Sequence, residues 1–287
     1  MKNIVILGSC LSEITVNALE NMGQYKKIYH GMHLRTDIIR ALLEDKTQNF
    51  LTKDSLESAI KFQQVDVDRN LPRIKFQSLE YLEALKENIQ IADVIVIDLN
   101  YDLSRKGYSF INEGKSSIPY IINFMQSLPD GKNKHMEPDK VNCKDKGLLS
   151  ANESIENLEE IITILKSINN KMEIFLINYP HSGFKIRNSM ERVRSSETFK
   201  KLIDKKISKK VHVIPLLNIK KEYLSEKGAY YFEPKVYETF ALYIKKILTE
   251  GNGSKDKESF YQIVFNYVKK FFKGRNVSEI FFDVITE

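Results

Sequence analysis

Short apolar segments alternate with amphipathic helical patterns along this chain, and the alternation constrains its fold more than any other feature. Residues 4–7, 94–97 and 174–177 are short, rich in β-branched or large apolar side chains, and apolar at successive positions. Such runs are typical of strands buried on both faces of a sheet. Residues 152–169 between two such runs have the spacing of an amphipathic helix. Right-handed crossovers would join these units into a mostly parallel sheet covered on both faces, which is the α/β class.

The same reasoning places the remaining elements of an α/β domain that we expect over residues 1–250. Further strands are expected at residues 27–29 and 211–216, and further helices at residues 12–22, 37–44, 78–88, 118–128, 195–207 and 234–249. Residues 129–148 combine Pro, Gly and Asn with many charged side chains. That composition predicts a surface loop or insertion.

The C-terminal segment, residues 251–287, differs from the rest in composition. Residues 251–254 read Gly-Asn-Gly-Ser, which is typical of a flexible linker. Apolar and aromatic side chains then recur at helical spacing from Phe260 to Phe272, with lysines beside them. We expect a linker followed by a helical tail. The tail would either pack on the domain or contact a second copy, a partner or a membrane surface.

Composition narrows the classes of function. The 287 residues include 44 Lys and Arg against 38 Asp and Glu, a net charge of +6. This mild excess is compatible with anionic substrates or a membrane surface, but basic and acidic residues are interleaved and no nucleic-acid reader motif is present. Two cysteines and five scattered histidines do not form a disulfide framework or a metal site, so we expect neither metal nor cofactor. Without a bilayer-length apolar run or a signal-peptide pattern, the expected location is the cytoplasm.

The turn after the first strand carries the most reactive side chain in the sequence. Gly8 breaks the apolar run, and Ser9 and Cys10 follow it directly before a helical pattern. In open α/β sheets, ligands and reactive groups gather at the carboxyl ends of strands. The positive end of a helix dipole would lower the pKa of a thiol there and favour the thiolate. The alternative is a tight glycine turn followed by a small buried cysteine.

Three other strand ends supply complementary groups. Asn100 lies at the end of the strand expected at 92–100, His181 follows the strand at 173–178, and Arg35 lies in the turn after the second strand. Together with Cys10 they would suffice for acyl transfer: a thiol nucleophile, an imidazole for proton transfer and an amide for the oxyanion. Arg35 would bind an anionic group. Each has an ordinary alternative, since His181 could be a loop histidine, Asn100 a turn cap and Arg35 a solvated charge.

Three segments of the chain resemble blocks of the SGNH/GDSL hydrolase superfamily. Residues 6–12 read Ile-Leu-Gly-Ser-Cys-Leu-Ser, residues 93–102 contain the sequence Asp-Leu-Asn-Tyr-Asp, and residues 229–240 lead into the last helix of the domain. Their order and spacing fit over residues 1–249. The chain is most similar to a Gly-Ser-Cys branch found with bacterial surface-polysaccharide genes.

The resemblance implies a flavodoxin-like three-layer αβα fold. It places Cys10 at the nucleophile position and Asn100 at the oxyanion position, with Gly8, Ser9, Arg35 and Tyr231 expected at the substrate. It implies a small-molecule or glycan substrate and, for a transferase, an acyl donor. The chain departs from the family at Tyr231, which stands where the family carries a catalytic His, and the Asp that normally precedes that His is also missing.

Two functions follow from this pattern. The first is an acyl esterase or acyltransferase acting on a bacterial glycan or glycan precursor, with His181 replacing the missing His. The alternative is a catalytically degenerate binding or scaffolding protein of a polysaccharide pathway. A phosphate-handling α/β module ranks last: a Gly-Ser-Cys turn at a helix N-terminus can bind anions, but the chain lacks both glycine-rich nucleotide fingerprints.

Overall fold

The structure is a computed structural model. It describes residues 1–32, 34–46, 50–55, 78–112, 115–117, 125–127, 133–135, 143–178, 197–198, 200–202, 205–207, 210–214, 217–219, 232–250 and 282–284.

Five parallel strands form the central sheet. They are β1 (Lys2–Gly8), β2 (Tyr25–Met32), β3 (Val94–Asp98), β9 (Glu173–Ile177) and β10 (His212–Ile214). Their spatial order is β10-β9-β3-β1-β2, and every neighbouring pair is parallel. This is the doubly wound order of flavodoxin-like folds, in which the chain changes direction between β1 and β3. The predicted α/β class is therefore confirmed.

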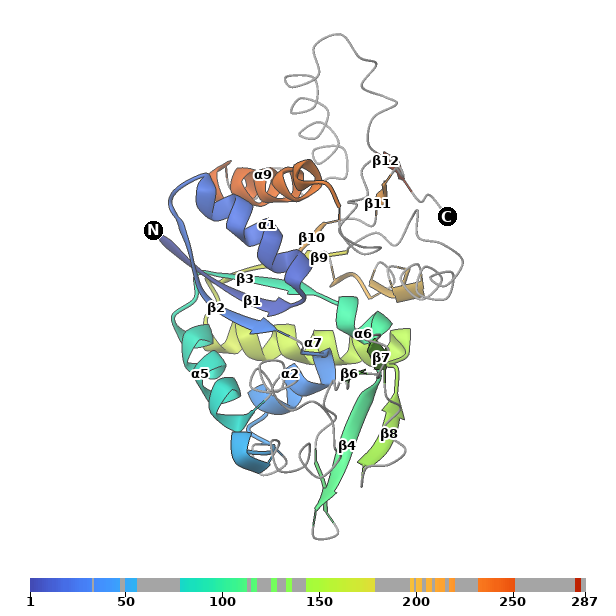
Figure 1. Cartoon of the computed structure of the whole chain (residues 1–287). Helices are drawn as coiled ribbons and strands as arrows, with labels where there is room; N and C mark the ends of the chain where they lie inside the picture. The colour runs from blue at the N-terminus through green and yellow to red at the C-terminus, as the bar shows by residue number, and fades with distance from the viewer. Residues whose placement is uncertain are drawn as a thin grey trace.

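Helices cover both faces of the sheet and make a three-layer domain (Figure 1). One layer holds α1 (Cys10–Asn21) and α9 (Pro234–Glu250), and the other holds α2 (Thr36–Leu43), α5 (Leu79–Gln90) and α7 (Ala151–Ile168). Along β1, Ile4 and Ile6 pack toward α1 and α9, while Val5 and Leu7 pack toward the other layer. The continuous apolar runs in the sequence thus have the predicted cause: both faces of these strands are buried.

Most predicted helices and strands are confirmed within about two residues of their bounds. Residues 197–198 and 200–202 are α-helical, which agrees with the first part of the helix expected over 195–207. Residues 205 and 206 form a turn, with Lys206 at φ 53°, so the expectation of helix to residue 207 is wrong. The helix α7 begins at a full capping box, in which Ser150 and Glu153 each bond the other's backbone N–H, at 2.8 and 3.2 Å. That arrangement satisfies two N–H groups of the first turn and fixes where the helix starts.

The segment between α6 (Asn100–Ser104) and α7 contains short antiparallel strands. The strand β4 (Gly107–Asn112) pairs with β5 (Lys115–Ser116) and with β8 (Cys143–Gly147), and β6 (Met125–Ser127) pairs with β7 (Asn133–His135). The helix predicted over 118–128 is therefore wrong at 125–127, and the loop predicted over 129–148 is partly strand. Short apolar runs do not distinguish helix from strand, and here an antiparallel partner decides the outcome.

The C-terminal prediction is also corrected where the structure describes it. The strand β12 (Phe282–Val284) pairs antiparallel with β11 (Leu217–Ile219), so these last residues are not helical. The apolar residues at helical spacing end at Phe272, and at 282–284 a cross-strand partner more than sixty residues away determines the structure. The linker at 251–254 and the helix expected around Phe260–Phe272 lie outside the described residues.

Candidate functional site

The carboxylate of Asp98 lies at the carboxyl end of β3 and receives the turn that follows β1. Its Oδ2 accepts hydrogen bonds from the Ser9 backbone N–H at 2.7 Å, the Ser9 hydroxyl at 2.9 Å and the Ser12 hydroxyl at 2.5 Å. Asp98, Ser9 and Ser12 are all buried. Three donors converging on one oxygen fix the geometry of this turn.

The other oxygen of the same carboxylate holds the segment after β3. Asp98 Oδ1 accepts a hydrogen bond from the Asn100 backbone N–H at 3.0 Å. A carboxylate accepts hydrogen bonds through both oxygens and donates none when ionised. Asp98 therefore joins the two segments that carry the predicted nucleophile and the predicted oxyanion donor.

Gly8 is required at its position by this carboxylate. A Cβ atom on Gly8 would lie 2.4 Å from Asp98 Oδ2 and 3.1 Å from the Asp98 backbone nitrogen. The register explains the contact, because Leu7 pairs with Ile97 and the next residues on the two parallel strands are Gly8 and Asp98. Any side chain at position 8 would displace the carboxylate or separate the two strand ends.

Cys10 is the first residue of α1 and is partly exposed. Ser9 caps this helix by accepting a hydrogen bond from the Leu11 backbone N–H at 3.3 Å. A thiol at this end of a twelve-residue helix lies in the positive part of the helix dipole, which favours the thiolate. The prediction of a strand-to-helix turn with Cys10 at the helix N-terminus is confirmed.

Asn100 is the first residue of the short helix α6. The Ser104 hydroxyl donates to its carbonyl oxygen at 2.6 Å. Within the described part of the chain, its side-chain Oδ1 is buried and makes no hydrogen bond. The carboxamide is thus the less satisfied part of an otherwise well-bonded segment.

A buried histidine on β2 lies beneath the Gly8 turn. His30 interacts electrostatically with Asp98 and with the Gly8 backbone, and its Nδ1 is 3.5 Å from Glu13 Oε2 on α1. Burial lowers the pKa of His30, with Glu13 and Asp98 acting in the opposite direction. Glu13 also bonds Lys27 Nζ at 2.8 Å. For this imidazole, burial therefore outweighs the two nearby carboxyl groups.

Asp98 itself has a raised pKa, and the cause is its burial. The hydrogen bonds from Ser12, Ser9 and Asn100 oppose that effect because they stabilise the ionised form.

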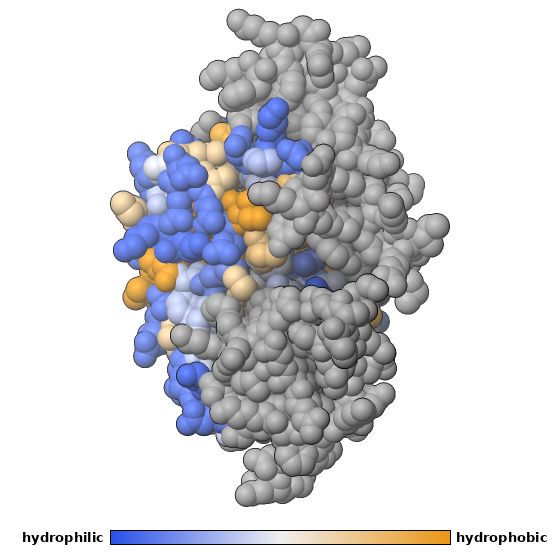
Figure 2. Space-filling view, in the orientation of Figure 1, coloured by the Kyte–Doolittle hydropathy of each residue, from blue (hydrophilic) through white to orange (hydrophobic). Residues whose placement is uncertain are grey.

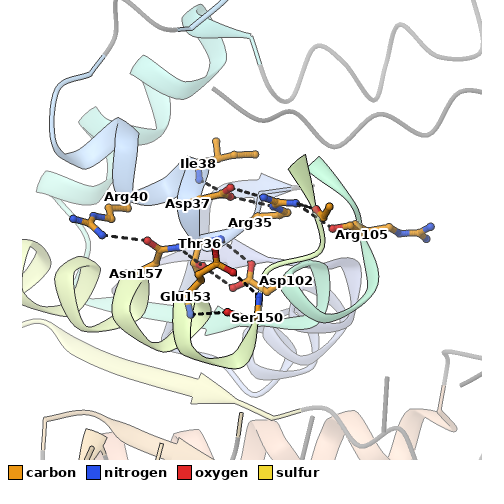
Figure 3. Close-up of polar contacts among 11 residues, drawn as sticks. Arg35, Thr36, Asp37, Ile38, Arg40, Asp102, Arg105, Ser150, Glu153 and Asn157 are labelled. Carbon is orange, nitrogen blue, oxygen red and sulfur yellow. Dashed lines mark hydrogen bonds and ion pairs between the residues drawn. The ribbon is translucent and has the colours of Figure 1, made fainter. Parts of the chain in front are cut away.

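Arg35 belongs to a second polar cluster (Figure 3). Its guanidinium bonds both oxygens of Asp37, the Gly147 carbonyl oxygen at 2.8 Å and the Arg105 carbonyl oxygen at 3.4 Å. The side chain is 1 % exposed. This placement does not support the predicted contact with substrate, because the guanidinium is bound inside the protein. It fastens the base of the inserted strands, where β4 leaves the domain and β8 returns.

A second buried aspartate lies beside Arg35. Asp102 accepts hydrogen bonds from the Thr36 backbone N–H at 2.8 Å and the Thr36 hydroxyl at 2.6 Å, at the start of α2. Asn157 on α7 donates to the Thr36 hydroxyl at 3.4 Å (Figure 3). Burial raises the pKa of Asp102 to about 6, with Thr36 opposing it and Asp37 adding to it.

The structure thus brings together the backbone segments of Gly8, Ser9, Cys10 and Asn100 and leaves Arg35 in a separate cluster. His181 and Tyr231 lie outside the described residues, so their predicted roles stay predictions. Among the described residues, no group of three or more His, Cys, Asp or Glu side chains could hold a metal ion.

Sequence reasoning missed the roles of Asp98, Ser12 and His30. A signal for Asp98 was present: it is a charged residue ending an otherwise apolar strand, next to a strand that ends in Gly. Parallel pairing puts those two ends side by side, and only a residue without a side chain leaves room for the carboxylate. Ser12 and His30 had no such signal, because their contacts depend on how α1 lies on the sheet.

No protein-family model matches the sequence, and no curated protein matches it.

The face shown in Figure 2 is mainly hydrophilic where it is coloured, with small separate apolar areas. None of the helices in the described ranges combines the length and apolar character needed to cross a membrane.

Proposed function

We propose that this protein is an SGNH-like acyl esterase or acyltransferase acting on a bacterial glycan or glycan precursor, with Cys10 as its nucleophile. One observation carries the proposal. Cys10 starts α1 at the end of β1, Asn100 starts α6 at the end of β3, and these strands flank the position where the sheet order reverses. That position is where open α/β sheets bind their ligands.

The groups at this edge fit a two-step acyl transfer. The Cys10 thiolate would attack the acyl carbonyl, form a thioester and release the alcohol, which takes up a proton. Water or a glycan hydroxyl would then attack the thioester, lose its proton and regenerate the thiolate. The Asn100 amide and backbone N–H groups of the first turn of α1 would stabilise each oxyanion. His181 is the predicted group for the proton transfers.

The second candidate is a binding or scaffolding protein on the same fold. Tyr231, which occupies the position of the family's catalytic His, favours it. In that case the turn would bind a sugar or acyl-bearing ligand without turnover. The two candidates differ in one measurable property, namely Cys10-dependent release of product.

The test combines thiol labelling with ester hydrolysis on the full chain. Iodoacetamide labelling of the native protein, mapped by peptide mass spectrometry, should modify Cys10. Cys10→Ala should lower hydrolysis of p-nitrophenyl acetate at least about 10³-fold, the scale on which loss of a nucleophile acts. Cys143→Ser removes the other cysteine and should keep the wild-type rate. A Cys10→Ala protein with undiminished hydrolysis would rule out the thiol mechanism, and wild-type protein without turnover would favour the binding role.

A further inference from the structure

We propose that Asp98 is a positioning residue, whose carboxylate holds the Cys10 turn and the Asn100 backbone in one fixed arrangement. The catalytic consequence rests on the proposed function, because it requires the thiol and the oxyanion donors to act on one carbonyl. The mechanical coupling of the two segments rests on the contacts of Asp98 alone.

Each oxygen of Asp98 serves a different segment. Oδ2 takes the Ser9 backbone N–H and the hydroxyls of Ser9 and Ser12, and Oδ1 takes the Asn100 backbone N–H. A backbone donor is present on both sides, so these bonds fix the main chain. Ser9 and Asp98 are 89 residues apart in the sequence. The Ser9 N–H lies directly before Cys10, the proposed nucleophile, and the other backbone N–H belongs to Asn100, the proposed oxyanion donor.

The sheet determines where Asp98 lies. The residue ends β3, which is flanked by β1 and β9, and its side chain is 3 % exposed. The missing Cβ of Gly8 lets the carboxylate lie directly against the neighbouring main chain. Asp98 therefore transmits the rigidity of the central strands to both turns, as a supporting residue around a functional group must.

This arrangement matters for chemistry because attack on a carbonyl tolerates little displacement. A misplacement of about 1 Å can lower a rate by about 10²-fold. The thiol and the amide are carried by turns on two different strands, and the Asp98 carboxylate bonds to both turns. Loosening it would let the two groups move independently while the rest of the domain stays folded.

Asp98→Asn tests the coupling, with Asp102→Asn as its matched control. In asparagine one of the two oxygens is replaced by an NH2 donor, so either the Ser9 N–H or the Asn100 N–H loses the acceptor that it faces. Asp102 is also buried and also accepts a backbone N–H and a hydroxyl, but at the start of α2. In amide hydrogen exchange, Asp98→Asn should lose protection at residues 8–13 or 98–101. Asp102→Asn should lose it at residues 34–39 and keep it at 8–13.

A merely structural role of Asp98 would leave kcat per folded molecule unchanged, so activity is the second measurement. Per folded molecule, Asp98→Asn should lower kcat for p-nitrophenyl acetate about 10²-fold with little change in KM, and Asp102→Asn should keep the wild-type kcat. Unchanged exchange at 8–13 and 98–101 in Asp98→Asn, or an equal loss of kcat in both variants, would overturn the proposal.

A measurement on the wild-type chain keeps the proposal testable if Asp98→Asn does not fold. The amide protons of Ser9 and Asn100 share Asp98 as acceptor, so they should exchange with the same opening free energy. Clearly different opening free energies would overturn the coupling. Absence of Cys10-dependent hydrolysis in the wild type would instead count against the proposed function and leave the exchange result intact.

Discussion

Two aspartates four residues apart are used in the same way at different places in the molecule. Asp98 accepts a backbone N–H and a hydroxyl from Ser9, the cap of α1, and Asp102 accepts the same pair from Thr36, the first residue of α2. Both are buried, and each ties the start of a helix that follows a strand to the segment around α6.

The two carboxylates have different roles because their surroundings differ. Asp98 has a second backbone donor, Asn100, and joins the ends of two central strands beside Cys10. Asp102 lies next to the Arg35–Asp37 pair, which fastens the base of the inserted strands. The same local motif therefore shapes the candidate site in one case and secures an insertion in the other.

Paired glycine substitutions should separate the two regions most strongly. Gly8→Ala puts a Cβ 2.4 Å from a carboxylate that is bonded at both oxygens, and Gly107→Ala puts one 2.5 Å from the Arg35 guanidinium. We expect Gly8→Ala to lower the free energy of unfolding by about 3 kcal/mol and Gly107→Ala by about 1–2 kcal/mol. The difference arises because a Cβ at Gly8 would also meet the Asp98 backbone nitrogen at 3.1 Å, whereas the three nearest atoms at Gly107 all belong to the Arg35 side chain.

Denaturant unfolding measures both stabilities, and iodoacetamide labelling reports on the site. Only Gly8→Ala should change the rate at which Cys10 is alkylated in the folded protein. Equal destabilisation, together with unchanged labelling in both variants, would show that the two regions are mechanically equivalent.

Sequence periodicity was enough to predict the sheet and its covering helices. Buried strands such as 4–7 and 94–97 are continuous apolar runs, and that pattern depends on neighbouring residues only. The antiparallel strands at 125–127 and 282–284 were not predicted, because each depends on a partner far along the chain or on a short hairpin.

The sequence predicts where the candidate site lies, but it predicts only some of the contacts within the site. Strand ends converge in any parallel sheet, so Gly8, Cys10 and Asn100 could be grouped from sequence. Arg35 follows a strand as well, but its guanidinium turns to Asp37 and Gly147. Where a side chain points depends on which acceptors the fold brings near it, and Gly147 is 112 residues away.

The raised pKa of Asp102 should make the free energy of unfolding depend on pH. Its folded-state pKa is raised to about 6 from 3.8 by burial, so the folded protein keeps this proton to a higher pH than the unfolded chain does. Stability from this group is therefore present at low pH and lost as the pH rises through about 6. Replacing it should relieve a cost of about 2–3 kcal/mol at pH 7.

Asp102→Asn should accordingly be less stable than wild type at pH 4, because it loses a hydrogen bond to Thr36, and the gap should narrow by pH 7. Comparing the two proteins at each pH cancels the opposite effect of His30, whose lowered pKa makes the folded state less stable below about pH 6.5. Urea unfolding at several pH values gives the comparison, and a constant gap from pH 4 to pH 7 would contradict it.

The smallest expected effect comes from removing one hydroxyl donor from each of the two carboxylates while their backbone donors stay in place. Ser12→Ala removes the hydroxyl that donates to Asp98 Oδ2 at 2.5 Å, and Thr36→Val removes the one that donates to Asp102 at 2.6 Å. Each should lower the free energy of unfolding by about 1.5–2 kcal/mol, the lower part of the range for a hydrogen bond to a charged group. Ser12→Ala leaves the Ser9 and Asn100 backbone bonds to Asp98 in place, so amide protection at residues 8–13 and the alkylation rate of Cys10 should match those of Thr36→Val. A changed alkylation rate in Ser12→Ala alone would contradict this prediction. It would mean that the Ser12 hydroxyl also positions the thiol, and that the two backbone bonds to Asp98 do not suffice to hold the main chain.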